Sequence, residues 1–278
     1  MALWGFEGWV GDFYPPGSKK SEFLELYVER MNAVEGNTFF YGVPTEERVE
    51  KWAEKMPSRF RICPKLHRDI THRGPLVPNK EEAAAFIQPM KAFDENLGAF
   101  HLQLPPSYGP DMHGDLERFL EAWPREKAPI AVEVRHTGWF DSPNDERLRA
   151  TLEDLGVARV LLDTRPIYDF DDDAQAHSDR QKPKVPMDPH RTCDLTFVRY
   201  ISHPDIPRND DYLERWAARI DDWLRDETDV YFFVHCPYER FSPTIARRFQ
   251  ALLEDRNAPV PPLPWNELPA SPQQPDLL

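Results

Sequence analysis

Residues 130–135 read IAVEVR, and the order of these six residues indicates the element that they form. Successive side chains of a strand point to opposite faces, so Val132 and Val134 share one face while Glu133 and Arg135 share the other. The valine face is suited to packing against helices. The pattern therefore predicts a strand of a parallel sheet with charged side chains on its inner face, near its carboxyl end.

Seven more short runs rich in β-branched and aromatic residues lie along the chain, and helical patterns alternate with them. Such alternation is typical of parallel βα units, and eight is the number of strands that closes a barrel. We therefore predict an α/β fold, a TIM-like (β/α)8 barrel in a single domain over residues 1–256. The predicted strands are residues 3–8, 33–37, 60–65, 99–103, 130–135, 158–163, 196–201 and 230–235, and the predicted helices are residues 18–31, 45–55, 79–96, 114–123, 144–155, 210–225 and 243–253.

An open, doubly wound sheet is the alternative architecture. It usually carries a glycine-rich dinucleotide-binding loop after its first strand. Gly5, Gly8 and Gly11 follow the start of the chain without the spacing of that loop. The barrel is therefore the preferred prediction.

Two irregular segments depart from the alternation. Residues 164–194 are polar, rich in proline and without periodicity, and they occupy the place of the sixth helix. A long irregular insertion of this kind is typical of a lid, a binding loop or a disordered segment. Residues 257–278 form a proline-rich C-terminal tail that cannot continue a helix, and we expect it to run extended over the surface or to be disordered.

The composition limits the classes of partner. The net charge of -14 repels nucleic acid and anionic membranes, although it says nothing about a single cleft. Three separated cysteines give no disulfide framework and no zinc motif. No signal peptide and no run of about 18 apolar residues is evident, so we predict a cytoplasmic protein with no membrane contact. The oligomeric state stays open.

Charged and polar residues gather where the predicted strands end. Burying this many charges is costly unless they pair or meet a ligand, and barrel sites are built at this end. We expect Lys65 and Glu133 to act as catalytic acid and base, and Arg135 and Arg199 to clamp a small polar or anionic ligand. The alternative is that these groups only form ion pairs with one another. The side chains expected at this mouth are Glu35, Asn37, Lys65, Gln103, Glu133, Arg135, Asp163, Arg199 and His235.

The sequence also contains residue types that can bind a metal ion. His101, His136, His235, Glu35, Glu133 and Asp163 are possible ligand types, but no HExxH motif and no compact histidine and aspartate cluster is present. We therefore expect no metal and no cofactor.

A set of short motifs occurs in a characteristic order: EGNTFFY from residue 35, FRICPK from residue 60, QLPPS from residue 103, VEVRH from residue 132, and VRY from residue 198. This order resembles the YecE-like family, domain of unknown function 72, over roughly residues 3–253. The resemblance implies a TIM-like barrel and no established activity. It matches the glutamate-x-asparagine pair of the family to Glu35 and Asn37 and its lysine to Lys65, and it adds His136 to Glu133 and Arg135. The short first strand, His235 and the insertion depart from the pattern, which puts the ligand more than the fold in question.

Three hypotheses for function follow. The preferred one is a metal-independent enzyme that acts on a small polar or anionic metabolite. The alternatives are a non-catalytic ligand-binding or scaffold protein and a metal-dependent, nuclease-like barrel. The acidic composition makes nucleic acid the least favoured ligand.

Overall fold

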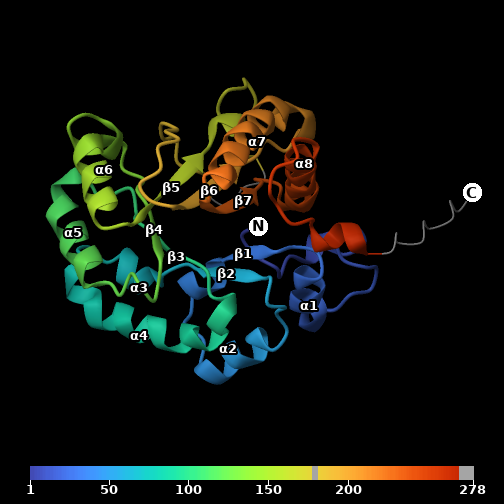
Figure 1. Cartoon of the computed structure of the whole chain (residues 1–278), viewed down its shortest axis with the longest axis horizontal. Helices are drawn as coiled ribbons and strands as arrows, with labels where there is room; N and C mark the ends of the chain where they lie inside the picture. The colour runs from blue at the N-terminus through green and yellow to red at the C-terminus, as the bar shows by residue number, and fades with distance from the viewer. Residues whose placement is uncertain (177–180, 269–278) are drawn as a thin grey trace, which may run out of the picture.

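Parallel strands form the centre of the molecule. The computed structural model of the chain describes residues 1–176 and 181–268 (Figure 1). β1 pairs with β2, and β3 to β7 form a five-stranded sheet in chain order, with every pairing parallel. Isolated bridges of Ile62 with Leu97 and of Lys65 with His101 connect β2 to the region of β3. The strands of the described residues are β1 (Ala33–Gly36), β2 (Arg61–Pro64), β3 (Phe100–Gln103), β4 (Ile130–Glu133), β5 (Ala158–Asp163), β6 (Leu195–Ile201) and β7 (Asp229–His235).

The first predicted strand, residues 3–8, is wrong. This segment contains no strand and passes into a 3-10 helix at Glu7–Trp9. The residue of β1 that forms a backbone hydrogen bond in this region, Glu35, donates from its N to Met1 O at 2.9 Å, ahead of the segment. Two glycines, Gly5 and Gly8, and the lack of any β-branched residue weaken the segment as a strand. The fold is therefore an α/β fold with a curled, parallel five-stranded sheet and a neighbouring pair of strands.

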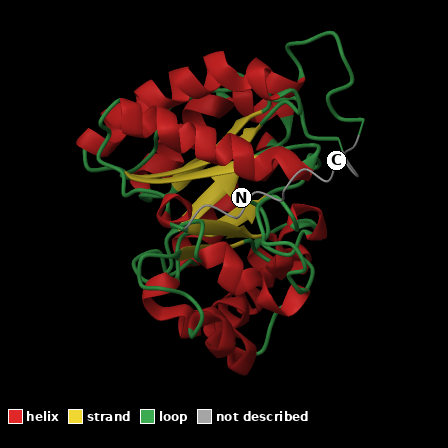
Figure 2. Ribbon diagram, turned by 90° about the vertical axis from the view of Figure 1, so that its right-hand side faces the viewer, coloured by secondary structure: helices red, strands yellow, loops and turns green. Residues whose placement is uncertain are grey.

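The helices lie outside the strands, and Figure 2 shows the strands between an upper and a lower group of helices. The seven predicted helices are present, and a short helix after β2 was not predicted. The first three and the fifth are shorter than predicted, the fourth is shifted by one residue, the sixth has the predicted bounds and the seventh is longer. Pro89 and the positive φ of Asp94 (47°) end the third of them before the predicted boundary, and a 3-10 segment, Lys91–Asn96, follows. None of the described helices has both the length and the apolar character that a membrane crossing needs. The helices are α1 (Phe23–Val28), α2 (Glu46–Ala53), α3 (Arg68–Thr71), α4 (Lys80–Met90), α5 (His113–Ala122), α6 (Asn144–Asp154), α7 (Asp210–Arg225) and α8 (Ser242–Asp255).

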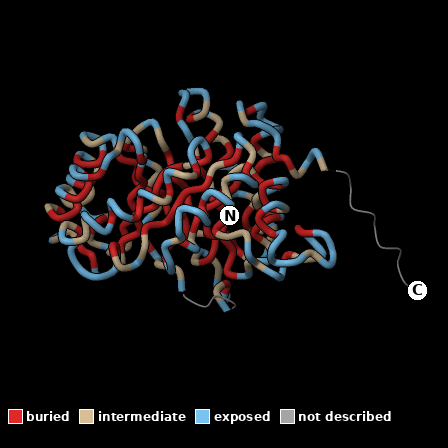
Figure 3. Tube along the Cα trace, turned by 90° about the horizontal axis from the view of Figure 1, so that it is seen from below, coloured by how far each residue is buried: buried red, intermediate tan, exposed pale blue. Residues whose placement is uncertain are grey.

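The two faces of the strands bury different sets of side chains. The outer faces, with residues such as Val132, Val198 and Tyr200, pack against the helices. The inner faces form a separate small cluster that fills the space enclosed by the strands, and the buried red trace in Figure 3 runs through this centre. The inner cluster contains Cys63, Ala99, Ala131, Ala158, Val160, Phe197, Tyr231 and Phe233. The alternation seen in the sequence therefore separates an interior from a helix-covered exterior.

The insertion between β5 and β6 covers the carboxyl ends of these strands. Its described part contains a 3-10 turn at Arg165–Ile167 and no α-helix. Ala174 and Val185 of the insertion pack with Leu162 and Ile201 at the ends of β5 and β6. The insertion therefore lies over the end of the sheet where the charged side chains gather.

The described part of the tail packs against the N-terminal region, near the end of α1. Trp265 contacts Phe13 with a ring separation of 4.9 Å, and its backbone N donates to Arg30 O at 3.2 Å. Residues 269–278 of the predicted tail lie outside the described residues.

Candidate functional site

An arginine between two carboxylates is the centre of the candidate site. Arg199 on β6 donates from Nε and Nη2 to Glu35 on β1, at 2.8 and 3.1 Å, and from Nη1 to Glu133 on β4, at 2.8 Å. Both glutamates are fully buried. Burial alone would raise their pKa values, but the positive charge of Arg199, together with that of Arg135 at Glu133, holds the pKa of each carboxyl well below its usual range. The trio therefore carries two permanent negative charges inside the protein.

Two buried histidines complete the inner part of the cluster. His235 at the end of β7 donates from Nε2 to Glu35 at 2.9 Å, and His101 on β3 donates from Nε2 to Glu133 at 3.1 Å. Burial lowers the pKa of His235 to about 3 in spite of its carboxylate partner. His235 is therefore a neutral hydrogen-bond donor at neutral pH and adds no charge.

Three side chains form the outer part of the cluster. The Oε1 atom of Gln103 accepts from Lys65 Nζ at 2.8 Å and from Arg135 Nη2 at 2.6 Å, and Arg135 Nε donates to Glu133 at 2.5 Å. Lys65 Nζ also lies 4.4 Å from the centre of the Phe40 ring. Burial and the positive charge of Arg199 lower the pKa of Lys65 to about 7. At neutral pH this amine is therefore present in both protonation states.

The insertion adds a further cation that the sequence did not predict. Burial and the charge of Arg199 lower the pKa of Lys182, and the charge of Lys182 in turn lowers the pKa of His235. The charge of Lys182 therefore interacts with the charges of the cluster. Nothing in the irregular sequence around it distinguishes this lysine from Lys184, which is exposed.

Asp163, which was expected at this mouth, lies on the opposite face of β5. The register pairs Leu162 with Arg199 and Asp163 with Tyr200, so Asp163 shares the helix-covered face of Tyr200. Its carboxylate accepts from Trp216 Nε1 at 2.7 Å and from Arg165 Nε at 2.9 Å. The prediction for this residue was wrong because it rested on position at a strand end and not on alternation.

Among the described residues, Asn37 and His136 form no hydrogen bond or ion pair with the cluster. Asn37 begins a 3-10 turn after β1, and its buried Oδ1 lacks a hydrogen-bond partner among the described residues. His136 accepts from Gly138 N at 3.0 Å and so caps the turn that follows β4. The structure therefore brings together seven of the ten predicted site residues, namely Glu35, Lys65, Gln103, Glu133, Arg135, Arg199 and His235.

His101 was left out of the predicted set although a signal for it existed. It alternates with Phe100 and Leu102 and shares the face of Gln103 on the same strand. Its ring also packs against Phe197 with a centroid separation of 5.1 Å, which connects the charged layer to the apolar interior. Alternation alone was therefore sufficient to assign it.

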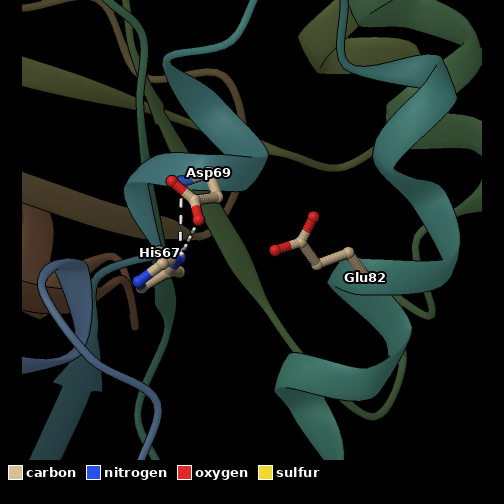
Figure 4. Close-up of side chains that lie close together, drawn as sticks. All are labelled: His67, Asp69 and Glu82. Carbon is tan, nitrogen blue, oxygen red and sulfur yellow. Dashed lines mark hydrogen bonds and ion pairs between the residues drawn. The ribbon is translucent and has the colours of Figure 1, made fainter.

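One group of side chains in the described part of the chain has metal-ligand spacing, and it belongs to α3 and α4. It comprises His67, Asp69 and Glu82 (Figure 4). His67 Nδ1 already accepts from Asp69 N at 3.3 Å, and Arg73 pairs with the Asp69 carboxylate at 2.9 Å. These contacts already engage His67 Nδ1 and the Asp69 carboxylate within the protein.

Known proteins similar to this chain carry no assigned reaction in their names. A family model described as "Protein of unknown function DUF72" matches residues 1–269. The UPF0759 protein YecE of Escherichia coli K12 is 33% identical over 257 residues, which cover 91% of this chain and 92% of the relative. The solved DUF72 family protein EF0366 of Enterococcus faecalis V583 has a TM-score of 0.68 at 18% identity, covering 83% of this chain and 88% of that chain. The DUF72 family protein TM1631 of Thermotoga maritima MSB8 has a TM-score of 0.66 at 20% identity, covering 91% and 97%. At these identities the solved structures support the fold alone.

Proposed function

Because this chain belongs to the DUF72 family of proteins of unknown function, we propose its activity from the charged cluster itself: a metal-independent enzyme that acts on a small anionic metabolite with Lys65 as its acid and base. The observation that carries the proposal is the buried Lys65 amine, with its pKa near 7, beside two arginines. A general acid or base works best when its pKa lies near the working pH.

The charge of the cluster favours an anion as the ligand. Lys65, Arg135, Arg199 and Lys182 supply positive charge, whereas Glu35 and Glu133 supply the negative charge. The lowered pKa values of both lysines are the expected result of burial next to an excess of positive charge. A phosphate or carboxylate bound beside them would relieve this repulsion, and the planar guanidinium of Arg135 can donate two parallel hydrogen bonds to it.

Glu133 is better suited to positioning than to proton transfer. Its carboxylate accepts from Arg135, Arg199 and His101, and its lowered pKa makes it a weak base. We therefore assign to Glu133 the role of holding the two arginines, and the proton-transfer role to Lys65. Gln103 orients both Lys65 and Arg135 through one oxygen atom.

We also propose that the strands close into a TIM-like barrel. Support comes from contacts across the strand order, because Glu35 on β1 binds Arg199 on β6 and His235 on β7. The contact between β1 and β7 supports an arrangement in which the first and last strands are neighbours.

Ligand binding without turnover is a second candidate function. The observation that favours it is that both buried glutamates already have cationic partners within the protein, so the cluster is stable without a reacting group. The nuclease-like alternative is weaker, because the net charge of -14 opposes a phosphodiester backbone.

The first test measures the titration of Lys65. In protein labelled with [13C]lysine, the Cε resonance of Lys65 is identified by its loss in Lys65→Arg, and it should titrate near pH 7. Saturating inorganic phosphate should move this titration upward by about one pH unit or more, because a bound anion stabilises the ammonium form. An unchanged titration would show that the anion binds elsewhere and that the proposal is wrong.

The second test measures turnover. A panel of small phosphomonoesters and carboxylates is incubated with the wild type and with Lys65→Ala, and conversion is followed by NMR. At least one compound should be converted by the wild type and not by the variant. If phosphate raises the pKa of Lys65 but no compound is converted faster by the wild type, the non-catalytic candidate replaces the enzyme.

A further inference from the structure

A groove rich in arginine runs along the outer side of α7, away from the charged cluster. It consists of two adjoining hollows of about 470 and 420 Å³ that share Arg165 and Arg215 in their walls. The larger hollow is also lined by Trp216, Arg219 and Trp223. In Figure 1 the helix lies at the top of the molecule, beside β5 and β6. The Asp163 carboxylate, which Arg165 and Trp216 share, points into this side of the sheet.

Two arginines of the groove form no ion pair within the part of the chain that the structure describes. Arg215 and Arg219 are one helical turn apart on the same face of α7, where like charges destabilise a helix. Neither forms an ion pair with any residue in the ranges 1–176 and 181–268. Burial and the charge of Arg165 lower the pKa of Arg219, although the charges of Asp163 and Asp188 act in the opposite direction. On a chain with a net charge of -14, this concentration of positive charge is unusual.

Aromatic rings in the groove restrict the positions of two of its guanidinium groups. The Arg219 guanidinium lies 5.6 Å from the centre of the Trp216 ring, and the Arg165 guanidinium lies 5.4 Å from that of Tyr212. Stacking on an aromatic face reduces the number of positions that a guanidinium can take. The acidic lining residues lie mainly at the other end, with Asp169 and Asp211, and Asp222 is the acidic residue that lines the larger hollow.

We propose that the larger hollow binds the phosphate group of a small phosphorylated organic molecule, with Arg215 and Arg219 as its principal ligands and Arg165 beside them. Guanidinium groups match phosphate oxygens with paired hydrogen bonds. The side chain of Trp223 offers an apolar wall for the organic part of the ligand. A nucleic acid is a poorer fit, because the charge of the whole chain repels a long polyanion while a single phosphate feels mainly the local arginines.

The experiment follows the side-chain Nε–Hε resonances of arginine in the full chain, labelled with [15N]arginine, during titration with phenyl phosphate. Arg215→Lys and Arg219→Lys assign the two resonances. Both should shift with one common binding curve, and the double variant Arg215→Ala/Arg219→Ala should weaken binding in the hollow, followed through Arg165, by at least about tenfold. Both residues are exposed or half-buried, so the variant should fold, which circular dichroism checks.

Two controls make the result specific. Arg225→Ala removes a cation from the same helix that is already paired with Asp221 at 2.8 Å, and it should leave the binding curve unchanged. Lys65→Arg should also leave it unchanged, since this site is separate from the charged cluster. Equal shifts in the wild type and in the double variant would overturn the proposal. Inorganic phosphate should bind more weakly than phenyl phosphate. Equal affinities would show that the organic group of the ligand contributes nothing to binding, which would contradict that part of the proposal.

Discussion

At the scale of single residues, the charged cluster depends on Arg199. Three of its nitrogen atoms donate to two carboxylates that are both fully buried. Removing two carboxylates from water costs several kcal/mol for each, and the cost is recovered only while a cation remains beside them. The loss of Arg199 should therefore lower the free energy of unfolding, because both buried carboxylates lose their shared cation.

Arg199→Met should lower the free energy of unfolding by about 3–5 kcal/mol at neutral pH, because Glu35 and Glu133 lose their shared partner. Urea denaturation measures the change. The triple variant Glu35→Gln/Glu133→Gln/Arg199→Met removes the uncompensated charge and should be more stable than the single variant. If the triple variant is no more stable, the uncompensated carboxylates are not the cause of the loss.

Asp163→Asn distinguishes a structural residue from a ligand-binding one. The change weakens the contacts with Arg165 and Trp216 and should cost about 2–4 kcal/mol of unfolding free energy. The phosphate-dependent titration of Lys65 should stay as in the wild type, since Asp163 faces away from the cluster. If phosphate no longer shifted the Lys65 titration in a folded Asp163→Asn variant, Asp163 would have to be part of the binding site.

At the scale of elements, the insertion between β5 and β6 both packs on the ends of these strands and carries Lys182, a cation near the charged cluster. Val185 and Ile167 pack on Leu162 and Ile201, and the same segment brings Lys182 toward Arg199. An irregular segment is retained only if its apolar contacts outweigh the entropy of ordering it. These buried side chains hold Lys182 in place together with two hydrogen bonds to its backbone, from Tyr168 OH to Lys182 O and from Lys182 N to Gln175 Oε1.

Val185→Asp should detach the insertion, because a buried carboxylate without a partner costs more than the packing provides. Amide hydrogen exchange should become faster within residues 164–194 and stay unchanged in β6 and β7. Gln181→Asp is the matched control, because this substitution adds the same charge to the same segment at an exposed position. Equal exchange in the two variants would show that Val185 does not anchor the insertion.

At the scale of the whole molecule, the outside of the protein is acidic while its central cluster has an excess of cations. The chain carries a net charge of -14, yet both Lys65 and Lys182 have lowered pKa values next to arginines. Keeping Lys65 buried therefore costs stability under conditions where the unfolded chain would protonate it. A cost of this kind is what the proposed anion-binding site predicts.

The pH dependence of stability should reveal this cost. The pKa of Lys65 falls from 10.5 to about 7 on folding, so between these pH values the unfolded chain binds one proton more than the folded chain. The free energy of unfolding of the wild type should therefore rise with pH from 7 toward 10.5, by up to about 1.4 kcal/mol per pH unit relative to Lys65→Met. Parallel curves for the two proteins over this range would contradict the lowered pKa.

Much of the architecture was predictable because it depends on short-range patterns. The period of two along β2, β3, β4, β6 and β7 identified the strands and their inner faces, and the same period contained the signal for His101. It failed for residues 3–8, where glycine weakens the strand, and it was not applied to Asp163. Alternation, helix periodicity and proline positions are properties of neighbouring residues, and the sequence by itself determined them.

Only the tertiary structure decided which charges meet. The bonds from Arg199 to Glu35 and from His235 to Glu35 join residues 164 and 200 positions apart, and Lys182 reaches the cluster from a segment without any pattern. Such pairings, and the pKa of Lys65 that follows from them, depend on how the strands curl and on what covers their ends. These are properties of the whole chain, because burial and distance, which set the strength of a charge interaction, exist only after the strands have come together.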